Sequence, residues 1–124
     1  MMELTTTIVT RALDAVYPEV NWYVNYVPET EQTVPALPVG RVVEVGMTHD
    51  NYASDRPMNM DTTIQVDVWL KTLGEAEAMY YAMDELFMNN KASLVYSEIS
   101  NDPDLANCTR VIKRYYIRRD IELG

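Results

Sequence analysis

The segment TTIQVDVWLKT, residues 62–72, decides the fold class because its apolar and polar side chains alternate. A period of two is typical of a half-buried β-strand. The apolar members are Ile64, Val66, Val68 and Leu70. The opposite side of this strand carries Asp67 and Trp69, together with Gln65 and Lys71. A tryptophan on the polar side of a strand raises the question of what that side contacts.

The residues after this strand predict a helix over 72–90, with the sequence TLGEAEAMYYAMDELFMNN. Thr72 and Glu75 have the spacing of a capping box, in which a hydroxyl and a carboxylate satisfy the first helical N–H groups. The apolar residues that recur at helical spacing form the expected buried stripe. They are Ala76, Met79, Tyr80, Met83, Leu86 and Phe87.

A second apolar stripe predicts an N-terminal helix over residues 4–16. It comprises Thr5, Ile8, Val9, Ala12, Leu13 and Val16. Tyr17 precedes Pro18, and a residue before proline is disfavoured in the helical region, so the helix should end there.

Four further alternating segments predict strands at residues 20–27, 41–49, 92–100 and 108–123. In the second of these, Val43, Val45 and Met47 are expected to share one side. Residues 28–40 and 50–61 are predicted as loops, and the second is longer than a tight hairpin needs. The order is α-β-β-β-α-β-β, which predicts one α+β domain over residues 1–124. A mostly antiparallel five-stranded sheet with both helices on one face would bury every apolar stripe.

Composition limits the classes of function. The chain has 124 residues, one cysteine and a net charge of −9, so an internal disulfide and a four-cysteine zinc site are excluded. An acidic chain is an unusual nucleic-acid binder. The charge is also uneven, with −12 over residues 1–109 and +3 over residues 110–124. The N-terminal residues lack the pattern of a signal peptide, and no apolar run is long enough to span a membrane, so a soluble cytoplasmic protein is expected.

The residues that could act in catalysis or bind a metal are better explained by structural roles. His49 is the only histidine and ends a strand, where surface polarity explains it. Cys108 is expected to be a small packing residue, because a nucleophile would need a partner and a lowered pKa. Glu98, Asp102 and Asp104 do not have EF-hand spacing. The four glycines are not clustered, so no phosphate-binding loop is predicted. We therefore expect no enzyme, no cofactor and no bound metal.

The unusual residues instead predict a surface for binding partners, because Trp, Tyr and Arg anchor protein interfaces. Asp67 and Trp69 are expected to share the polar side of the sheet with the polar side of the last strand. That side carries Arg110, Arg114, Tyr116 and Arg118. A basic strand on an acidic body is complementary to a second copy of the chain. In the alternative interpretation, the basic residues pair with acids of their own chain, such as Glu44 or Asp67.

The predicted loop at residues 50–61 is a second candidate surface. It carries Tyr52, Arg56, Met58 and Met60, and flexible methionines suit adaptable contacts with a partner. The alternative is that this loop folds back on its own domain.

The order of elements resembles that of the tail-terminator (tail-completion, or minor tail) proteins of long-tailed bacteriophages. The resemblance spans nearly the whole chain, and QVDVW (65–69) followed by EAEAMYYAMDEL (75–86) is its most suggestive part. It implies a small α/β subunit that forms a hexameric ring, caps the growing tail tube, ends tube polymerisation and provides the head–tail joining surface. It brings no catalytic residues to assign.

The resemblance also implies partners and a location. The expected partners are other copies of the chain, the tail tube protein and the head–tail connector proteins. DNA would pass through the ring without specific binding, and acidic walls would not hold it. The protein would reside in the tail or neck of the virion, and in the host cytoplasm during assembly, without contacting a membrane.

Two alternatives stay open. A neck or head-closure protein would bind the portal side in place of the tube. A small metal-dependent hydrolase or nuclease would use Asp67 and Glu44 on adjacent strands, and structural charge networks perturb such acids equally well.

Overall fold

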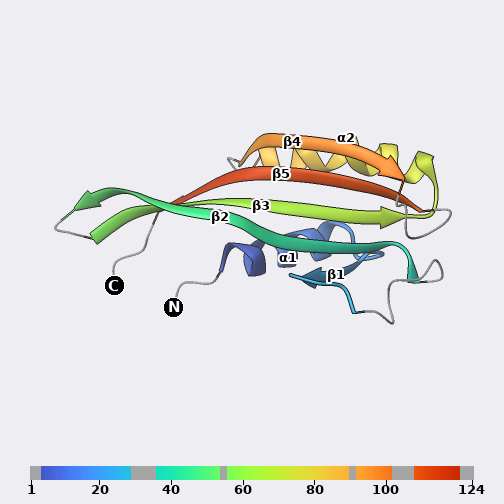
Figure 1. The fold of residues 1–124 in the computed structure, drawn as a ribbon, viewed down its shortest axis with the longest axis horizontal. Coiled ribbons are helices and arrows are strands. Elements are labelled where there is room, and N and C mark those ends of the chain that lie inside the picture. The colour runs from blue at the N-terminus through green and yellow to red at the C-terminus, as the bar shows by residue number, and fades with distance from the viewer. Residues whose placement is uncertain (1–3, 29–35, 54–55, 90–91, 102–107, 121–124) are drawn as a thin grey trace.

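The structure, a computed structural model, describes residues 4–28, 36–53, 56–89, 92–101 and 108–120, with the backbone alone for residues 47–53, 56–60, 101 and 119–120. Its elements follow the expected order α-β-β-β-α-β-β (Figure 1). They are α1 (Thr5–Val16), β1 (Asn21–Val24), β2 (Val39–Ala53), β3 (Arg56–Leu70), α2 (Leu73–Met88), β4 (Ala92–Asn101) and β5 (Thr109–Asp120).

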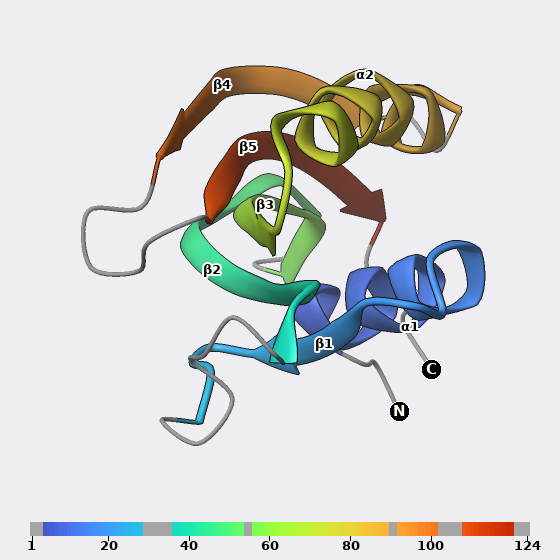
Figure 2. The same ribbon diagram turned by 90° about the vertical axis from the view of Figure 1, so that its right-hand side faces the viewer.

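The five strands form one mixed sheet in the order β1-β2-β3-β5-β4. β1 runs parallel to β2, and the other neighbouring pairs are antiparallel. Figure 2 shows that the sheet is strongly curved and that α1 and α2 lie on the same side of it. The predicted α+β class is therefore confirmed.

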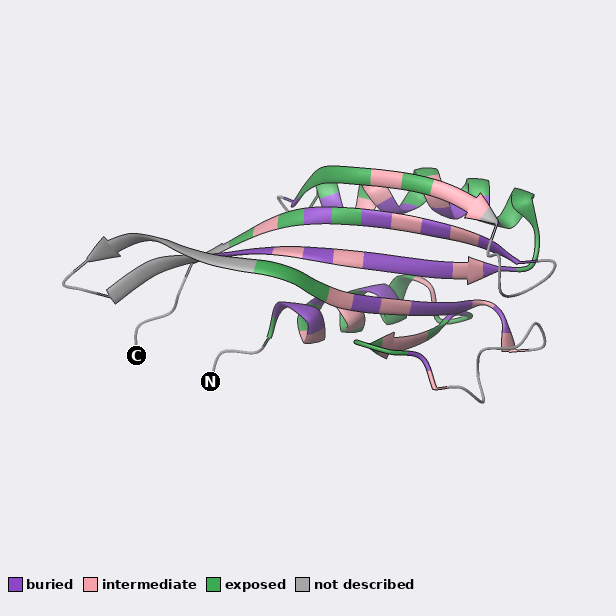
Figure 3. Ribbon diagram, viewed as in Figure 1, coloured by how far each residue is buried: buried purple, intermediate pink, exposed green. Residues whose placement is uncertain are grey.

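The core fills the space between the helices and one face of the sheet, which we call the helix face. Ile64, Val66 and Val68 are wholly buried there, as the alternation in β3 predicts. They pack in one cluster with Leu13 of α1 and Met83 of α2. Each such side chain stabilises the fold by about 1.5–3 kcal/mol when fully buried. Figure 3 shows the buried residues concentrated on the central strands, whereas much of β4 and α2 is exposed.

The helices match their predictions unequally. In α2 the buried residues are Ala76, Met79, Met83 and Phe87, and the Thr72 hydroxyl accepts a hydrogen bond from Glu75 N at 3.1 Å. In α1 the buried stripe is narrower than predicted and comprises Thr5, Thr6, Val9 and Leu13. Ile8, Ala12 and Val16 are exposed because α1 packs mainly against β1 and β2, which cover one side of the helix.

The prediction of a loop at residues 50–61 is wrong. β2 and β3 pair with each other up to Ala53 and Arg56, so only residues 54 and 55 connect them. β5 accompanies this hairpin as far as the pair of Asn59 with Asp120. Beyond that pair the hairpin continues as two strands, and Figure 1 shows it projecting past the rest of the domain.

A β-bulge at Val45 overturns the predicted alternation in β2. Glu44 pairs with Ile64 and Gly46 pairs with Thr63, so one extra residue is inserted between them. Val43 therefore takes a position on the opposite side of the sheet from the position of Met47. Val45 itself is exposed, as expected for the inserted residue of a bulge.

The helix face also contains a charged cluster that the sequence pattern does not predict. Lys113 is wholly buried on β5, and its Nζ lies 3.1 Å from Asp84 Oδ2 of α2. Tyr115 donates its hydroxyl to the other carboxylate oxygen of Asp84 at 2.6 Å, and its ring stacks on Phe87. Burial and the hydrogen bond to Asp84 raise the pKa of the Tyr115 phenol. The cluster therefore fixes how α2 lies on β5.

We expect Gly40→Ala to destabilise the fold by about 1–3 kcal/mol, the usual cost of overpacking. Trp22 of β1 pairs with Gly40 of β2, and its ring lies over the glycine. A Cβ added at Gly40 would lie 2.3 Å from the ring of Trp22. The measurement is the midpoint of urea unfolding. Gly74→Ala is the matched control, because nothing lies within 4 Å of its added Cβ and alanine favours a helix. An unfolding midpoint that Gly40→Ala leaves unchanged would contradict the packing of Trp22.

Candidate interaction surface

The sheet face opposite the helices, which we call the open face, is organised around a buried aspartate. Asp67 of β3 is wholly buried. Its Oδ2 accepts hydrogen bonds from Arg41 Nε at 3.1 Å and Nη2 at 2.7 Å, and its Oδ1 accepts one from Arg110 Nη2 at 2.8 Å. Gln65 Nε2 lies within 3.2 Å of both oxygens. One carboxylate thus holds two guanidinium groups from the strands on either side of it.

Strand register explains this arrangement. Arg41 of β2 lies directly across from Asp67, and Arg110 of β5 lies directly across from Trp69. Residues opposite or diagonal on one side of a sheet are close enough for long side chains to meet. The guanidinium carbons of Arg41 and Arg110 lie 5.5 Å and 5.2 Å from the centre of the Trp69 ring, within cation–π range. Trp69 is therefore held between two arginines that Asp67 positions.

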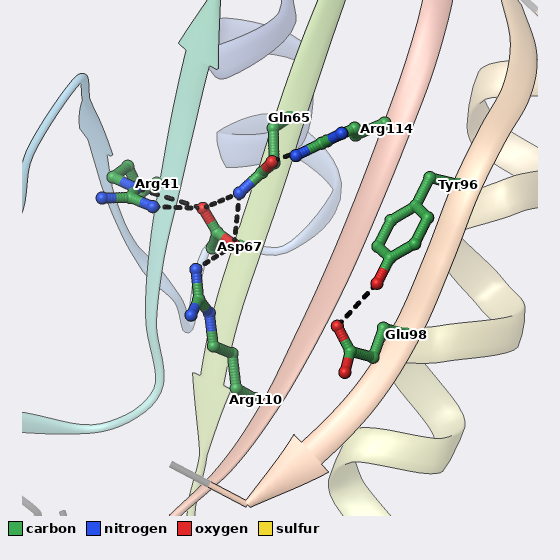
Figure 4. Close-up of polar contacts among 7 residues, drawn as sticks. All are labelled: Arg41, Gln65, Asp67, Tyr96, Glu98, Arg110 and Arg114. Carbon is green, nitrogen blue, oxygen red and sulfur yellow. Dashed lines mark hydrogen bonds and ion pairs between the residues drawn. The ribbon is translucent and has the colours of Figure 1, made fainter. Parts of the chain in front are cut away.

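The contacts continue across the sheet to β4 (Figure 4). Arg114 Nε of β5 donates to Gln65 Oε1 at 2.8 Å, and its guanidinium lies 5.3 Å from the centre of the Tyr96 ring. Tyr96 donates its hydroxyl to Glu98 Oε2 at 2.8 Å, and this bond raises the pKa of the phenol. Side chains from β2, β3, β5 and β4 are thus joined in one series of contacts.

A second carboxylate contact lies further along β3. Tyr116 of β5 donates its hydroxyl to Asp61 Oδ2. Asp61 is buried, and its Oδ1 has no hydrogen-bond partner among the described residues. Tyr116 itself stays 37% exposed, so this contact fixes the ring on the surface of the open face.

Segments of the same chain cover the Trp69 end of the open face. Val27, Leu37, Val39 and Cys108 form a small buried cluster there, and Trp69 packs against it. Cys108 is therefore the packing residue that the sequence predicts. The accessible part of the open face lies over β4 and β5, where Tyr96, Arg114, Tyr116 and Arg118 are exposed. We call these four residues the basic patch.

The structure brings some of the predicted residues together and revises the role of one of them. Asp67, Trp69 and Arg110 come together, and Arg114, Tyr116 and Arg118 share the open face, as predicted. The carboxylate of Asp67 is inaccessible, so it positions arginines and cannot contact a partner directly. The alternative that basic residues pair with their own chain is confirmed for Arg110 with Asp67.

The other four predicted residues lie far from this cluster. Tyr52 pairs with Pro57, and Arg56 pairs with Ala53, at the end of the β2–β3 hairpin. Met58 is also on this part of β3, whereas Met60 pairs with Arg119 of β5, and all four side chains lie outside the described part of the structure. At about 3.3 Å per residue, Met58 is roughly 30 Å along the strand from Asp67. Tyr52, Arg56 and Met58 therefore belong to a region of their own, whereas Met60 lies next to Asp61, the residue that pairs with Arg118.

The geometry does not favour the metal-dependent alternative. Glu44 pairs with Ile64 and so takes a position on the helix face, whereas Asp67 lies on the open face. Within the described ranges, no group of three or more His, Cys, Asp or Glu side chains is placed to hold a metal ion. The side chain of His49, and Asp102 and Asp104 altogether, lie outside the described residues.

Three residues of the surface were not singled out from the sequence. Arg41, Gln65 and Tyr96 connect Asp67 to the rest of the open face. Arg41 begins an alternating segment, which was a usable signal, but its partner depends on the register of β2 with β3. That register could not be derived once residues 50–61 had been predicted as a loop.

Comparison with known proteins adds no further constraint. No protein-family model matches the chain, and no curated protein matches it at a significant level. In the part of the chain that the structure describes, neither helix combines the length and the apolar character needed to cross a membrane.

Proposed function

We propose that this chain is a virion structural protein of a long-tailed bacteriophage, which assembles into a ring, caps the tail tube and joins tail to head. The observation that carries the proposal is the open face. It displays tyrosines and arginines, the residue types that dominate interface energetics. Tyr96, Arg114 and Tyr116 are held by contacts within the chain, which lowers the entropic cost of binding a partner.

Two further features support the proposal. The projecting β2–β3 hairpin gives the chain an arm that reaches beyond its own core, which suits docking to an adjacent ring or to the tube (Figure 1). The net charge of −9 suits a passage for DNA, because acidic walls repel phosphates and do not retain them. Neither feature requires a catalytic group.

The test is assembly with the tail tube protein encoded in the same genome. We expect the purified chain, alone or with that tube protein, to form a particle of about 86 kDa, six times the 14.3 kDa of one chain. Size-exclusion chromatography with light scattering measures this mass. Electron microscopy should show tubes that end at a ring, and tubes grown without the chain should be longer and unregulated in length.

Two outcomes would contradict the proposal. Tube length that does not depend on the chain, with no density at the tube ends, would exclude a terminator. Copurification with heads in place of tails would instead identify the neck or head-closure protein that the sequence leaves as the alternative.

A further inference from the structure

The outward side of α2 is unusually apolar for a surface helix. Tyr81 is 72% exposed and Met88 is 70% exposed, and the neighbouring Ala78 and Ala82 are exposed as well. These residues lie on the opposite side of the helix from the buried stripe. Exposed apolar side chains that gather within a rim of polar residues mark interaction sites, so this surface is a candidate for contact with a partner.

Acidic residues surround these apolar side chains. Helix α2 carries Glu75, Glu77, Asp84 and Glu85, and its sequence has no lysine or arginine. Glu77 and Glu85 are exposed and, at helical spacing, flank Tyr81 on the same outward side. We call Glu77, Tyr81, Glu85 and Met88 the acidic helix patch.

The acidic helix patch and the basic patch have complementary chemistry. The basic patch offers the cations of Arg114 and Arg118 beside the rings of Tyr96 and Tyr116. Two acidic patches would repel each other, and so would two basic patches, whereas one of each attracts. Both patches also present an exposed tyrosine, a residue type that is enriched at interfaces.

The two patches also point in opposite directions. The open face is the side of the sheet away from the helices (Figure 2). The acidic helix patch lies on the side of α2 opposite its buried stripe, and that stripe packs on the sheet. One chain therefore presents complementary surfaces at its front and back. Contacts between unlike surfaces propagate from copy to copy, and they close into a ring when the rotation between copies permits.

From these observations we propose that the acidic helix patch of one copy docks on the basic patch of the next copy. This inference rests on the proposed ring and names its subunit contact. Tyr81 is suited to be the central contact, because its ring packs edge-on against Tyr80 at 5.2 Å and is already held in place. Glu77 and Glu85 would then face Arg114 and Arg118 across the contact.

The experiment uses one variant in each patch. Tyr81→Arg places a cation opposite the basic patch, and Arg114→Glu places an anion opposite the acidic helix patch. We expect each variant by itself to weaken self-association at least about tenfold, the effect of losing one good contact. Sedimentation velocity over a range of concentrations measures this. The control is Asp14→Arg at an exposed position of α1, which changes charge outside both patches.

Mixing the two variants tests the head-to-tail arrangement. The Tyr81→Arg chain keeps an intact basic patch, and the Arg114→Glu chain keeps an intact acidic helix patch. An equimolar mixture should therefore recover at least one good contact and form at least a dimer of about 29 kDa, twice the 14.3 kDa of one chain. Circular dichroism and thermal unfolding should show that both variants are folded, since both positions are exposed.

Three results would overturn the inference. They are a wild-type chain that stays monomeric at 1 mM, variants that associate as the wild type does, and a mixture that stays monomeric while the wild type assembles. Variants that still form normal rings on tubes would refute this contact and leave the proposed function standing. Failure of the wild-type chain to cap tubes would refute the proposed function.

Discussion

Asp84→Asn should destabilise the fold by about 2–4 kcal/mol, the largest effect we expect from a single isosteric change. The substitution removes the counter-ion of Lys113, whose side chain is 0% exposed and cannot turn to water. Leaving one member of a buried ion pair without its partner costs several kcal/mol. We place the value toward the lower end because Asp84 itself is 25% exposed, so solvent already screens part of the interaction.

A double-mutant cycle separates the ion pair from other effects of Asp84→Asn. Lys113→Met keeps the volume and removes the charge, so it should cost less, because water can hydrate the remaining carboxylate of Asp84. In the double variant no charge is left without a partner, and its loss of stability should be smaller than the sum of the single losses by about 1–3 kcal/mol. Urea unfolding measures all four proteins.

Glu77→Gln is the matched control for this cycle, since it removes an exposed carboxylate from the same helix. It should change the free energy of unfolding by less than about 0.5 kcal/mol. Additive losses in the double variant would show that Asp84 and Lys113 are not coupled. The cluster would then not be what orients α2 on β5.

The sequence predicts the layers of this fold because burial imposes a strict period on each element. Ile64, Val66 and Val68 could only face a core, and the stripe through Met79 and Met83 could only pack on that core. The order of elements and the shared side of the helices follow from these patterns. Local chemistry was also readable, since Thr72 could be identified as a helix cap from one hydroxyl and its spacing to Glu75.

Register could not be predicted, and most of the surface depends on it. Residues 50–61 have polar side chains and a proline, which favour a loop, yet the backbone pairs through them as a hairpin. With only residues 54 and 55 between the strands, and one inserted residue at Val45, Arg41 falls opposite Asp67. Gly46, directly after Val45, was a signal for a bulge, because an isolated glycine within a strand often marks one. That signal does not fix the pairing, because the length of the turn was also unknown.

The buried pair shows a second limit of pattern reasoning. Lys113 falls on the apolar side of β5 between Val111 and Tyr115, which was a visible anomaly. Its partner Asp84 borders the buried stripe of α2, but only the packing angle of the helix on the sheet brings the two together. A long-range charge pair between separate elements depends on that angle, and neither segment encodes it by itself.

Asp67→Asn is the second change for which we expect a large effect, with a loss of about 2–3 kcal/mol. The carboxylate is wholly buried and accepts charge-assisted hydrogen bonds from Arg41 and Arg110. An asparagine would keep one acceptor oxygen and direct an NH₂ group at a guanidinium. The cost is reduced because the side chains of Arg41 and Arg110 remain 26% and 29% exposed and can be hydrated.

Two measurements test this effect. Urea unfolding gives the loss of stability, with Asp14→Asn at an exposed position of α1 as the matched control. Trp69 fluorescence reports the geometry, in a Trp22→Phe background that leaves a single tryptophan. Because Asp67 holds the two arginines against the indole, its replacement should shift the emission to longer wavelength and make Trp69 more accessible to iodide.

Asp67→Asn also distinguishes a positioning role from a purely structural one. If the carboxylate serves the open face by ordering Gln65, and through it Arg114, the variant should lose self-association even under conditions where it is fully folded. We expect a loss of about tenfold, corresponding to one ordered interface side chain. Normal self-association by a folded but destabilised variant would show that Asp67 only stabilises the sheet. The ordering of Gln65 and Arg114 by Asp67 would then not be needed for self-association.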